Sequence, residues 1–183
     1  SGADGTMAHM HPVRRRGFSL IELIVVVGVT ALLAGVLVSY NSQSRAQVAL
    51  SVERAKISQV IGRARSLSIS TYLQNPTNCG FGVTFDLGPS RTYGLIQFDN
   101  TTCSDLTGGT ITPRETFRLD PAVEFGAGAN QVGLLVFVPP DPTLLMEDPA
   151  GSALSGIGKI YLAERGGANL VALDVGFAGQ VSF

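Results

Sequence analysis

The chain has 183 residues, of which 45% are hydrophobic and 15% are charged, and its formal net charge is −1. This length is enough for one domain and a membrane anchor. Both histidines, His9 and His11, precede residue 18, so residues 18–183 contain none. That absence excludes a histidine-dependent triad or a histidine metal site from this part of the chain. We therefore predict that the protein is not an enzyme and has no catalytic residue, no metal site and no cofactor.

A strongly apolar segment follows three arginines near the start of the chain. Residues 14–16 are the arginines, and Glu22 is the one charged residue in the run from 18 to 38. A run of about 20 apolar residues can cross a bilayer as a helix, and the arginines predict that its first end stays on the cytoplasmic side. A lone carboxylate in lipid costs about 3 kcal/mol or more. Glu22 is therefore expected to have a functional partner.

The sequence Gly17-Phe18-Ser19-Leu20-Ile21-Glu22-Leu23 resembles the class III leader of type IV pilins and type II secretion pseudopilins. The resemblance implies that a prepilin peptidase cleaves between Gly17 and Phe18 and methylates the new amine of Phe18. It also implies that Glu22 neutralises the N-terminal amine of a neighbouring subunit as a filament assembles. Two charges in apolar surroundings are tolerable as a pair, which agrees with that role. The alternative is an ordinary signal anchor that happens to carry a glutamate.

Two further features, one near the C-terminal end and one at Ser39, refine this resemblance. Residues 158–163, 170–175 and 179–181 are similar to the final strands of GspH/FimT-type minor pseudopilins and minor pilins. Major type IV pilins usually have proline at the position that Ser39 occupies here. The departure favours a minor subunit over the principal subunit of a retractile pilus, and we predict that the helix continues through Ser39.

The chain is expected to fall into four parts. Residues 1–17 are interpreted as a tag remnant followed by the cleaved leader. Residues 18–40 are predicted to form a transmembrane and polymerisation helix, residues 41–74 an amphipathic helix, and residues 75–183 a β-rich globular head.

The amphipathic part is predicted from apolar residues that recur at helical spacing. Its stripe consists of Leu50, Ile57, Ile61, Ala64 and Leu67, widened by Val48, Val52 and Val60. A helix with such a stripe has to bury it, so we expect a sheet to fold onto it.

After Asn75-Pro76, which is expected to end the helix, the sequence consists of short strand-like runs separated by glycine and proline. Residues 99–113 are expected to form an exposed loop. The predicted strands are 81–87, 92–98, 116–119, 123–125, 132–138, 159–163, 170–175 and 180–183. Strands that follow a single helix predict an α+β fold. We therefore expect a long N-terminal helix packed on an antiparallel β-sheet head, which is also the ladle shape that the pilin resemblance implies.

Cys79 and Cys103 are the two cysteines of the chain, about 24 positions apart. A cysteine pair in a small exported domain predicts a disulfide. Two free buried thiols are the alternative, while two cysteines without histidine supply too few ligands for zinc.

Charge is distributed unevenly along the chain. Residues 41–73 carry five basic side chains against Glu53, whereas the segment beyond them is acidic. A basic helix and an acidic head suit electrostatic packing between subunits. Nucleic acid is an unlikely ligand for an acidic head, although Arg114, Arg118 and Arg165 would give it a basic patch if they cluster.

Together these features predict a minor pilin or pseudopilin that serves as a structural subunit of a type IV pilus-like filament. Its expected partners are other pilins or pseudopilins, the prepilin peptidase, an inner-membrane assembly platform, and membrane lipid before assembly. Its expected location is the cytoplasmic membrane, with the head outside the cytoplasm, and then an extracytoplasmic filament. The rival interpretations are a type II secretion piston subunit, a DNA-binding minor pilin displayed on a filament, and an anchored ectodomain that never polymerises.

Overall fold

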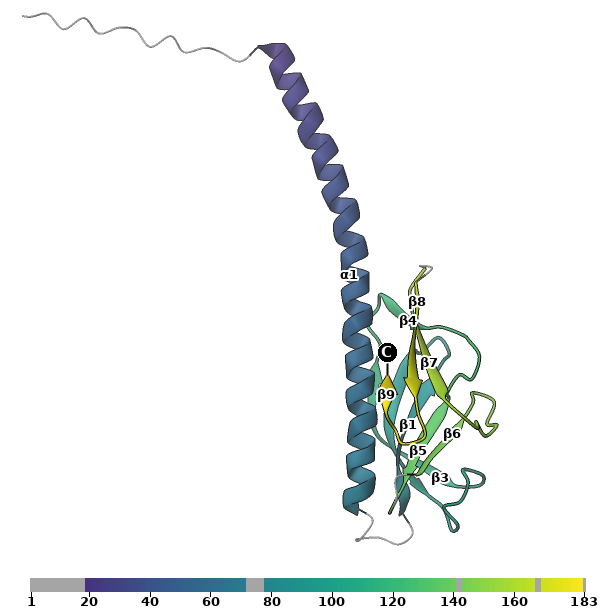
Figure 1. Cartoon of the computed structure of the whole chain (residues 1–183). Coiled ribbons are helices and arrows are strands. Elements are labelled where there is room, and N and C mark those ends of the chain that lie inside the picture. The colour runs from purple at the N-terminus through teal and green to yellow at the C-terminus, as the bar shows by residue number, and fades with distance from the viewer. Residues whose placement is uncertain (1–18, 72–77, 141–142, 167–168, 183) are drawn as a thin grey trace, which may run out of the picture. The chain divides into compact units, whose positions relative to one another are not determined.

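The computed structural model describes residues 19–71, 78–140, 143–166 and 169–182. For residues 38–44 it describes the main chain and not the side chains. In these ranges it contains one helix, α1, and nine strands (Figure 1). The chain divides into two units, Ser1–Ser42 and Gln43–Phe183. The predicted α+β class is confirmed.

Helix α1 runs without a break from Leu20 to Thr71 and therefore belongs to both units. It includes Ser39, which confirms the predicted continuity at that position. The segment expected to end it, Asn75-Pro76, lies outside the described residues.

In the second unit, one face of α1 is buried. Its buried residues are Ala46, Leu50, Glu53, Ile57, Val60, Ile61, Ala64 and Ser68. The prediction was wrong for Val48 and Val52, which are 60% and 44% exposed. Each lies two positions from Leu50, and at 3.6 residues per turn this turns the side chain to the far side of the helix.

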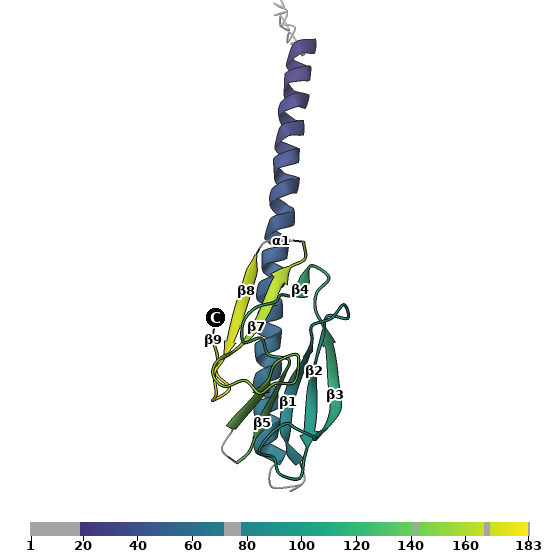
Figure 2. The same ribbon diagram turned by 90° about the vertical axis from the view of Figure 1, so that its right-hand side faces the viewer.

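The head contains two antiparallel sheets where the sequence predicted one (Figure 2). The first has the order β3-β2-β1-β5-β6 and the second the order β4-β7-β8-β9. The strands of the first sheet are β1 (Asn78–Asp86), β2 (Thr92–Asp99), β3 (Thr110–Arg118), β5 (Leu134–Val138) and β6 (Thr143–Glu147). Those of the second are β4 (Val123–Phe125), β7 (Gly158–Glu164), β8 (Leu170–Val175) and β9 (Val181–Ser182).

Two edge strands of the first sheet depart from the prediction. Strand β6 was missed, because it is short and directly follows a proline-rich segment. Strand β3 begins at Thr110, inside the predicted loop, and contains Pro113. Proline is tolerated on an edge strand, since one side of that strand has no neighbour. The pairing passes from Leu95 opposite Glu115 to Ile96 opposite Pro113, so Arg114 forms a bulge.

The first sheet buries both of its faces. One face packs with α1 and the second sheet in the larger core, where Ile61, Leu95 and Phe137 are almost completely buried. The other face forms a smaller core around Phe98 and Val136. Successive strand residues point to opposite faces, which is why apolar residues fill consecutive positions in these strands.

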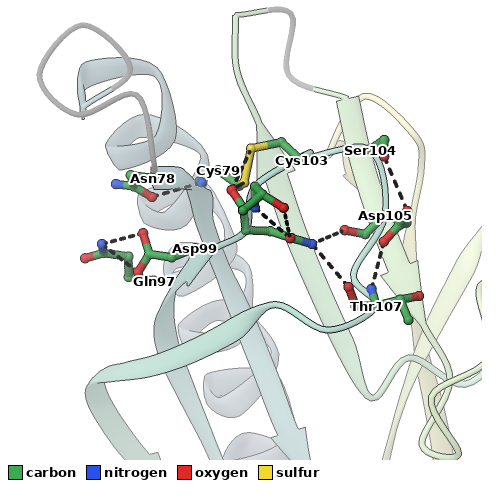
Figure 3. Close-up of a disulfide and its surroundings, with 11 residues drawn as sticks. Asn78, Cys79, Gln97, Asp99, Cys103, Ser104, Asp105 and Thr107 are labelled. Atoms are coloured by element: carbon green, nitrogen blue, oxygen red, sulfur yellow. Dashed lines mark hydrogen bonds between the residues drawn. A yellow bond between two sulfur atoms is a disulfide. The ribbon is translucent and has the colours of Figure 1, made fainter.

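The smaller core is covered by the segment between β2 and β3. The Cys79–Cys103 disulfide ties this segment to β1, so the predicted bond is present (Figure 3). The Asn100 side-chain amide donates to the main-chain carbonyls of Asp105 and Thr107, at 3.4 and 3.2 Å. Leu106 is buried against the core, so the segment is a cover and not the fully exposed loop that was expected.

Replacing both cysteines by alanine is expected to lower the free energy of unfolding by about 3 kcal/mol, since the closed loop restricts the unfolded chain. Urea unfolding of the full chain in detergent measures this change. Hydrogen exchange should accelerate most around Phe98, beneath the cover. The exposed loop variant Ser104→Ala is the control and should unfold like the parent. A loss below about 1 kcal/mol for the double variant would contradict the assigned role of the bond.

Candidate functional site

The first unit presents a helix surface that is apolar on every side. Leu20–Leu37 has a mean hydropathy of 2.6, and none of its residues is buried. A helix that is apolar all round requires lipid or other protein around it. Its 18 residues rise about 27 Å, close to the hydrocarbon thickness of a bilayer. By length and composition this segment is suited to cross a membrane.

Glu22 lies in the first turn of this helix and is exposed. From residue 17 to residue 44 it is the one charged residue of the sequence. The Leu23 N–H donates to the Ser19 carbonyl at 3.1 Å, so Ser19 stands at the start of the helix. Ser19 and Glu22 have the spacing of a capping box, a signal present in the sequence that the sequence analysis missed. A carboxylate there also interacts favourably with the positive end of the helix dipole.

The other predicted residues of the processing site, Gly17 and Phe18, lie outside the described residues. Cleavage between them, methylation of Phe18 and the pairing of Glu22 with an amine therefore stay predictions. Cys79 and Cys103 lie together in the head, where they have a structural role.

Part of the positive charge on the second half of α1 is neutralised within the chain. The Arg63 guanidinium contacts both carboxylate oxygens of Glu115 on β3, at 2.6 and 2.7 Å. Lys56 Nζ lies 2.7 Å from Glu53 Oε1. The basic helix and the acidic head thus attract each other inside one subunit, which leaves less charge for packing between subunits than the sequence suggested.

Glu53 is a buried carboxylate that the sequence analysis did not single out. Its side chain is 1% exposed, and its Oε2 has no hydrogen-bond partner among the described residues. Its spacing from Leu50 and Ile57 places it on the buried stripe, which is the signal that would have revealed it. Burial, followed by the negative charge of Glu53, raises the pKa of Tyr93 to about 12.

Two of the three arginines considered for a basic patch, Arg114 and Arg165, have different surroundings. Arg165 lines a hollow of about 350 Å³ together with Arg91 and Glu124, and neither Arg114 nor Arg118 contributes to it. Arg114 instead donates through Nε to Gln97 Oε1 at 3.1 Å. Within the described ranges, no group of three or more histidine, cysteine or acidic residues is placed to hold a metal.

Comparison with known proteins agrees with the reading of the N-terminal segment. The family model described as the prokaryotic N-terminal methylation motif matches residues 13–38. The chain carries a prokaryotic N-terminal methylation motif. This finding supports the recognition of a pilin-like leader, because the matched range contains the residues that carry the resemblance.

A solved structure, that of the minor pseudopilin EpsH from the Type 2 Secretion System of Vibrio cholerae, is similar to this chain. The identity is 13%, the TM-score is 0.41, and the match covers 72% of this chain and 93% of that chain. No curated protein matches the chain in sequence.

The buried carboxylate predicts a pH effect that can be measured at Tyr93. Glu53→Gln should lower the pKa of Tyr93 from about 12 yet leave it above 10.0, because burial is the larger cause. Folding favours the protonated phenol, so its contribution to stability is full below about pH 10 and is lost as pH rises through about 12. Carbon-13 NMR of labelled tyrosines in detergent measures this titration. Glu115→Gln is the matched control, and an unchanged pKa in Glu53→Gln would contradict the prediction.

Proposed function

We propose that the protein is a minor pilin or pseudopilin, a non-enzymatic structural subunit of a type IV pilus-like filament. One observation carries the proposal: the methylation motif of residues 13–38 coincides with an exposed apolar helix, Leu20–Leu37, whose one charged residue is Glu22. In a domain surrounded by water this apolar surface would stay unburied. A subunit stored in lipid and then packed among similar helices uses all of it.

Processing is proposed to create the missing partner of Glu22. Cleavage between Gly17 and Phe18 by a prepilin peptidase would release an amine, a group that can carry a positive charge. Methylation of the Phe18 amine keeps that charge. The mature chain would then begin with one positive and one negative group at the same end of an apolar helix.

Pairing of Glu22 with the Phe18 amine of a neighbouring subunit is proposed to guide assembly. Either charge alone is unfavourable in apolar surroundings, and a close pair cancels much of that cost. The pair would also set the axial position of one helix against the next. In this scheme residues 18–40 span the membrane and then form the filament core, residues 41–74 link them to the head, and residues 75–183 are displayed.

The proposed location follows from the order of these parts. The leader stays on the cytoplasmic side of the inner membrane, and the head lies outside the cytoplasm before and after assembly. An assembly platform and other pilins or pseudopilins are the proposed partners. A subunit of a pilus and a subunit of a type II secretion piston would both need this apolar helix. The two differ in the proteins with which they assemble. The genes beside this one, either a secretin with secretion-pathway proteins or a retraction ATPase, would distinguish the two.

Co-expression with a prepilin peptidase tests the processing step directly. The intact mass is expected to be that of a chain starting at Phe18 and carrying one added methyl group. Gly17→Ala is expected to remain uncleaved, because the leader resemblance places glycine immediately before the cut. If the parent chain stays whole while a control prepilin is cleaved in the same cells, the protein is an anchored ectodomain and the filament proposal fails.

Variants of Glu22 test the assembly step and separate charge from helix capping. Glu22→Ala and Glu22→Gln should both be cleaved, yet both should be lost from sheared filaments, since removing one partner of a buried pair costs about 3–5 kcal/mol. Immunoblotting of the filament and membrane fractions measures incorporation, with Leu23→Ala as the neighbouring control. Normal incorporation of Glu22→Gln alone would show that capping matters and that the ion pair does not.

A further inference from the structure

A polar hollow lies at the end of the head where β1 turns into β2. Its volume is about 350 Å³, at the small end of the range for ligand pockets. It is formed by the β1–β2 turn, by strand β4 and by Arg165, the residue that follows β7. Because Val123 at the start of β4 pairs with Glu164 at the end of β7, these two walls lie side by side.

Two arginines from distant parts of the chain line this hollow, and both are tied to the segment between β3 and β4. The Arg91 guanidinium donates through Nη1 to the Pro121 carbonyl at 3.2 Å. The main-chain N–H of Arg165 donates to the carbonyl of the next residue, Ala122, at 2.9 Å. The hydrogen bonds to this one segment therefore fix the β1–β2 turn and the end of β7 at the hollow.

The β1–β2 turn is ordered by hydrogen bonds of its own. The Asp86 carboxylate accepts from the Gly88 N–H at 3.0 Å and from the Ser90 hydroxyl. The Arg91 N–H donates to the Gly88 carbonyl at 3.2 Å, and the Arg91 carbonyl accepts from the Leu119 N–H at 3.0 Å. This wall of the hollow is thus formed in advance, so a ligand loses little affinity to the ordering of the site.

The charges of the hollow favour an anion with a single negative charge. None of the ion pairs between described residues involves Arg91, Glu124 or Arg165, all three of which line the hollow. Guanidinium groups bind carboxylates and phosphates through parallel N–H groups. Two arginines and one glutamate leave one positive charge, which a carboxylate matches. A phosphate group carries more than one negative charge and would be repelled by Glu124.

Two further features of the hollow narrow the class of ligand. Glu124 is half-buried on β4, and its carboxylate can accept a hydrogen bond from a ligand N–H. Leu87, Pro89 and Phe125 add apolar surface, and the Phe125 ring is held edge-on against Phe85 with centroids 6.0 Å apart. The last residue of a peptide chain carries a carboxylate, an N–H and a side chain on one carbon atom, so it matches all three features.

We propose that this hollow binds the C-terminal residue of a partner protein. Arg91 and Arg165 bind its carboxylate, Glu124 accepts its N–H, and its apolar side chain contacts Phe125. Capture of a terminal carboxylate is one of the recurring modes of peptide recognition. The site goes beyond the proposed filament role and lies within Gln43–Phe183, so it requires neither cleavage nor assembly.

The test titrates the nitrogen-15-labelled full chain, in micelles of an uncharged detergent, with the peptide acetyl-Thr-Thr-Leu. The side-chain Nε–H resonances of Arg91 and Arg165 are expected to shift and to saturate at millimolar peptide. The same peptide with a C-terminal amide should bind about tenfold more weakly or worse, because it loses the hydrogen bonds between a charged carboxylate and the arginines.

A pair of arginine variants locates the site. Arg165→Gln should weaken binding of the free-acid peptide about tenfold, since it removes one cation and keeps the main-chain bond to Ala122. Arg118→Gln is the matched control, because Arg118 is also exposed but does not line the hollow. Its binding should equal that of the parent. Thermal unfolding verifies that both variants are folded.

The role of Glu124 is tested with a peptide whose terminal leucine is N-methylated. The parent chain should bind this analogue several-fold more weakly than acetyl-Thr-Thr-Leu, because the analogue has no N–H to donate to Glu124. In Glu124→Ala the two peptides should bind alike. A difference that persists in Glu124→Ala would contradict the role given to this carboxylate.

Four results would overturn the proposal. The first is the absence of any shift at about 10 mM peptide, a concentration that populates even a weak complex. The second is equal binding of the acid and the amide, and the third is unchanged binding by Arg165→Gln. The fourth is binding of inorganic phosphate as tight as that of the peptide, which would make the hollow a phosphate site. Each is observed on the uncleaved chain, so each is distinct from failure of the proposed function.

Discussion

The structure depends on one helix that has to bury apolar side chains in two different environments. Along Leu20–Leu37 the apolar surface covers the whole circumference, and the chain itself buries none of it. From Ala46 to Ser68 the buried residues form a single stripe against the head. Because the helix is continuous, the two requirements follow one another along its sequence. An all-round apolar segment needs lipid or other helices, whereas a one-sided stripe is satisfied by the subunit's own sheets.

The first sheet also has to bury apolar side chains, and it does so on both of its faces. One face takes the stripe of α1, and the other would be open to solvent without the segment between β2 and β3, which Cys103 ties to β1. The disulfide therefore holds the covering segment over the smaller core in addition to closing a loop. The second sheet is bounded by two short strands, β4 and β9.

Two glutamates of α1 show how environment assigns different roles to one side chain. Glu53 sits on the buried stripe and has Lys56 at 2.7 Å, so the subunit provides its partner. Glu22 lies in a stretch where the sequence provides no basic residue from 17 to 44. Its proposed partner, the amine of another subunit, exists only after processing. The first pair is complete within one subunit, and the second would make assembly conditional on cleavage.

The sequence by itself determined the leader motif, the apolar helix and its continuity through Ser39, the cysteine pair, and most of the strands, because each rests on local spacing or composition. Tertiary structure decided what local patterns do not encode. The division into two sheets, the strand β6 and the placement of Thr110–Pro113 in β3 all depend on partners distant in sequence. The burial of Glu53 and the outward position of Val52 do as well. A side chain is buried or exposed according to what packs beside it, and only the complete fold decides that.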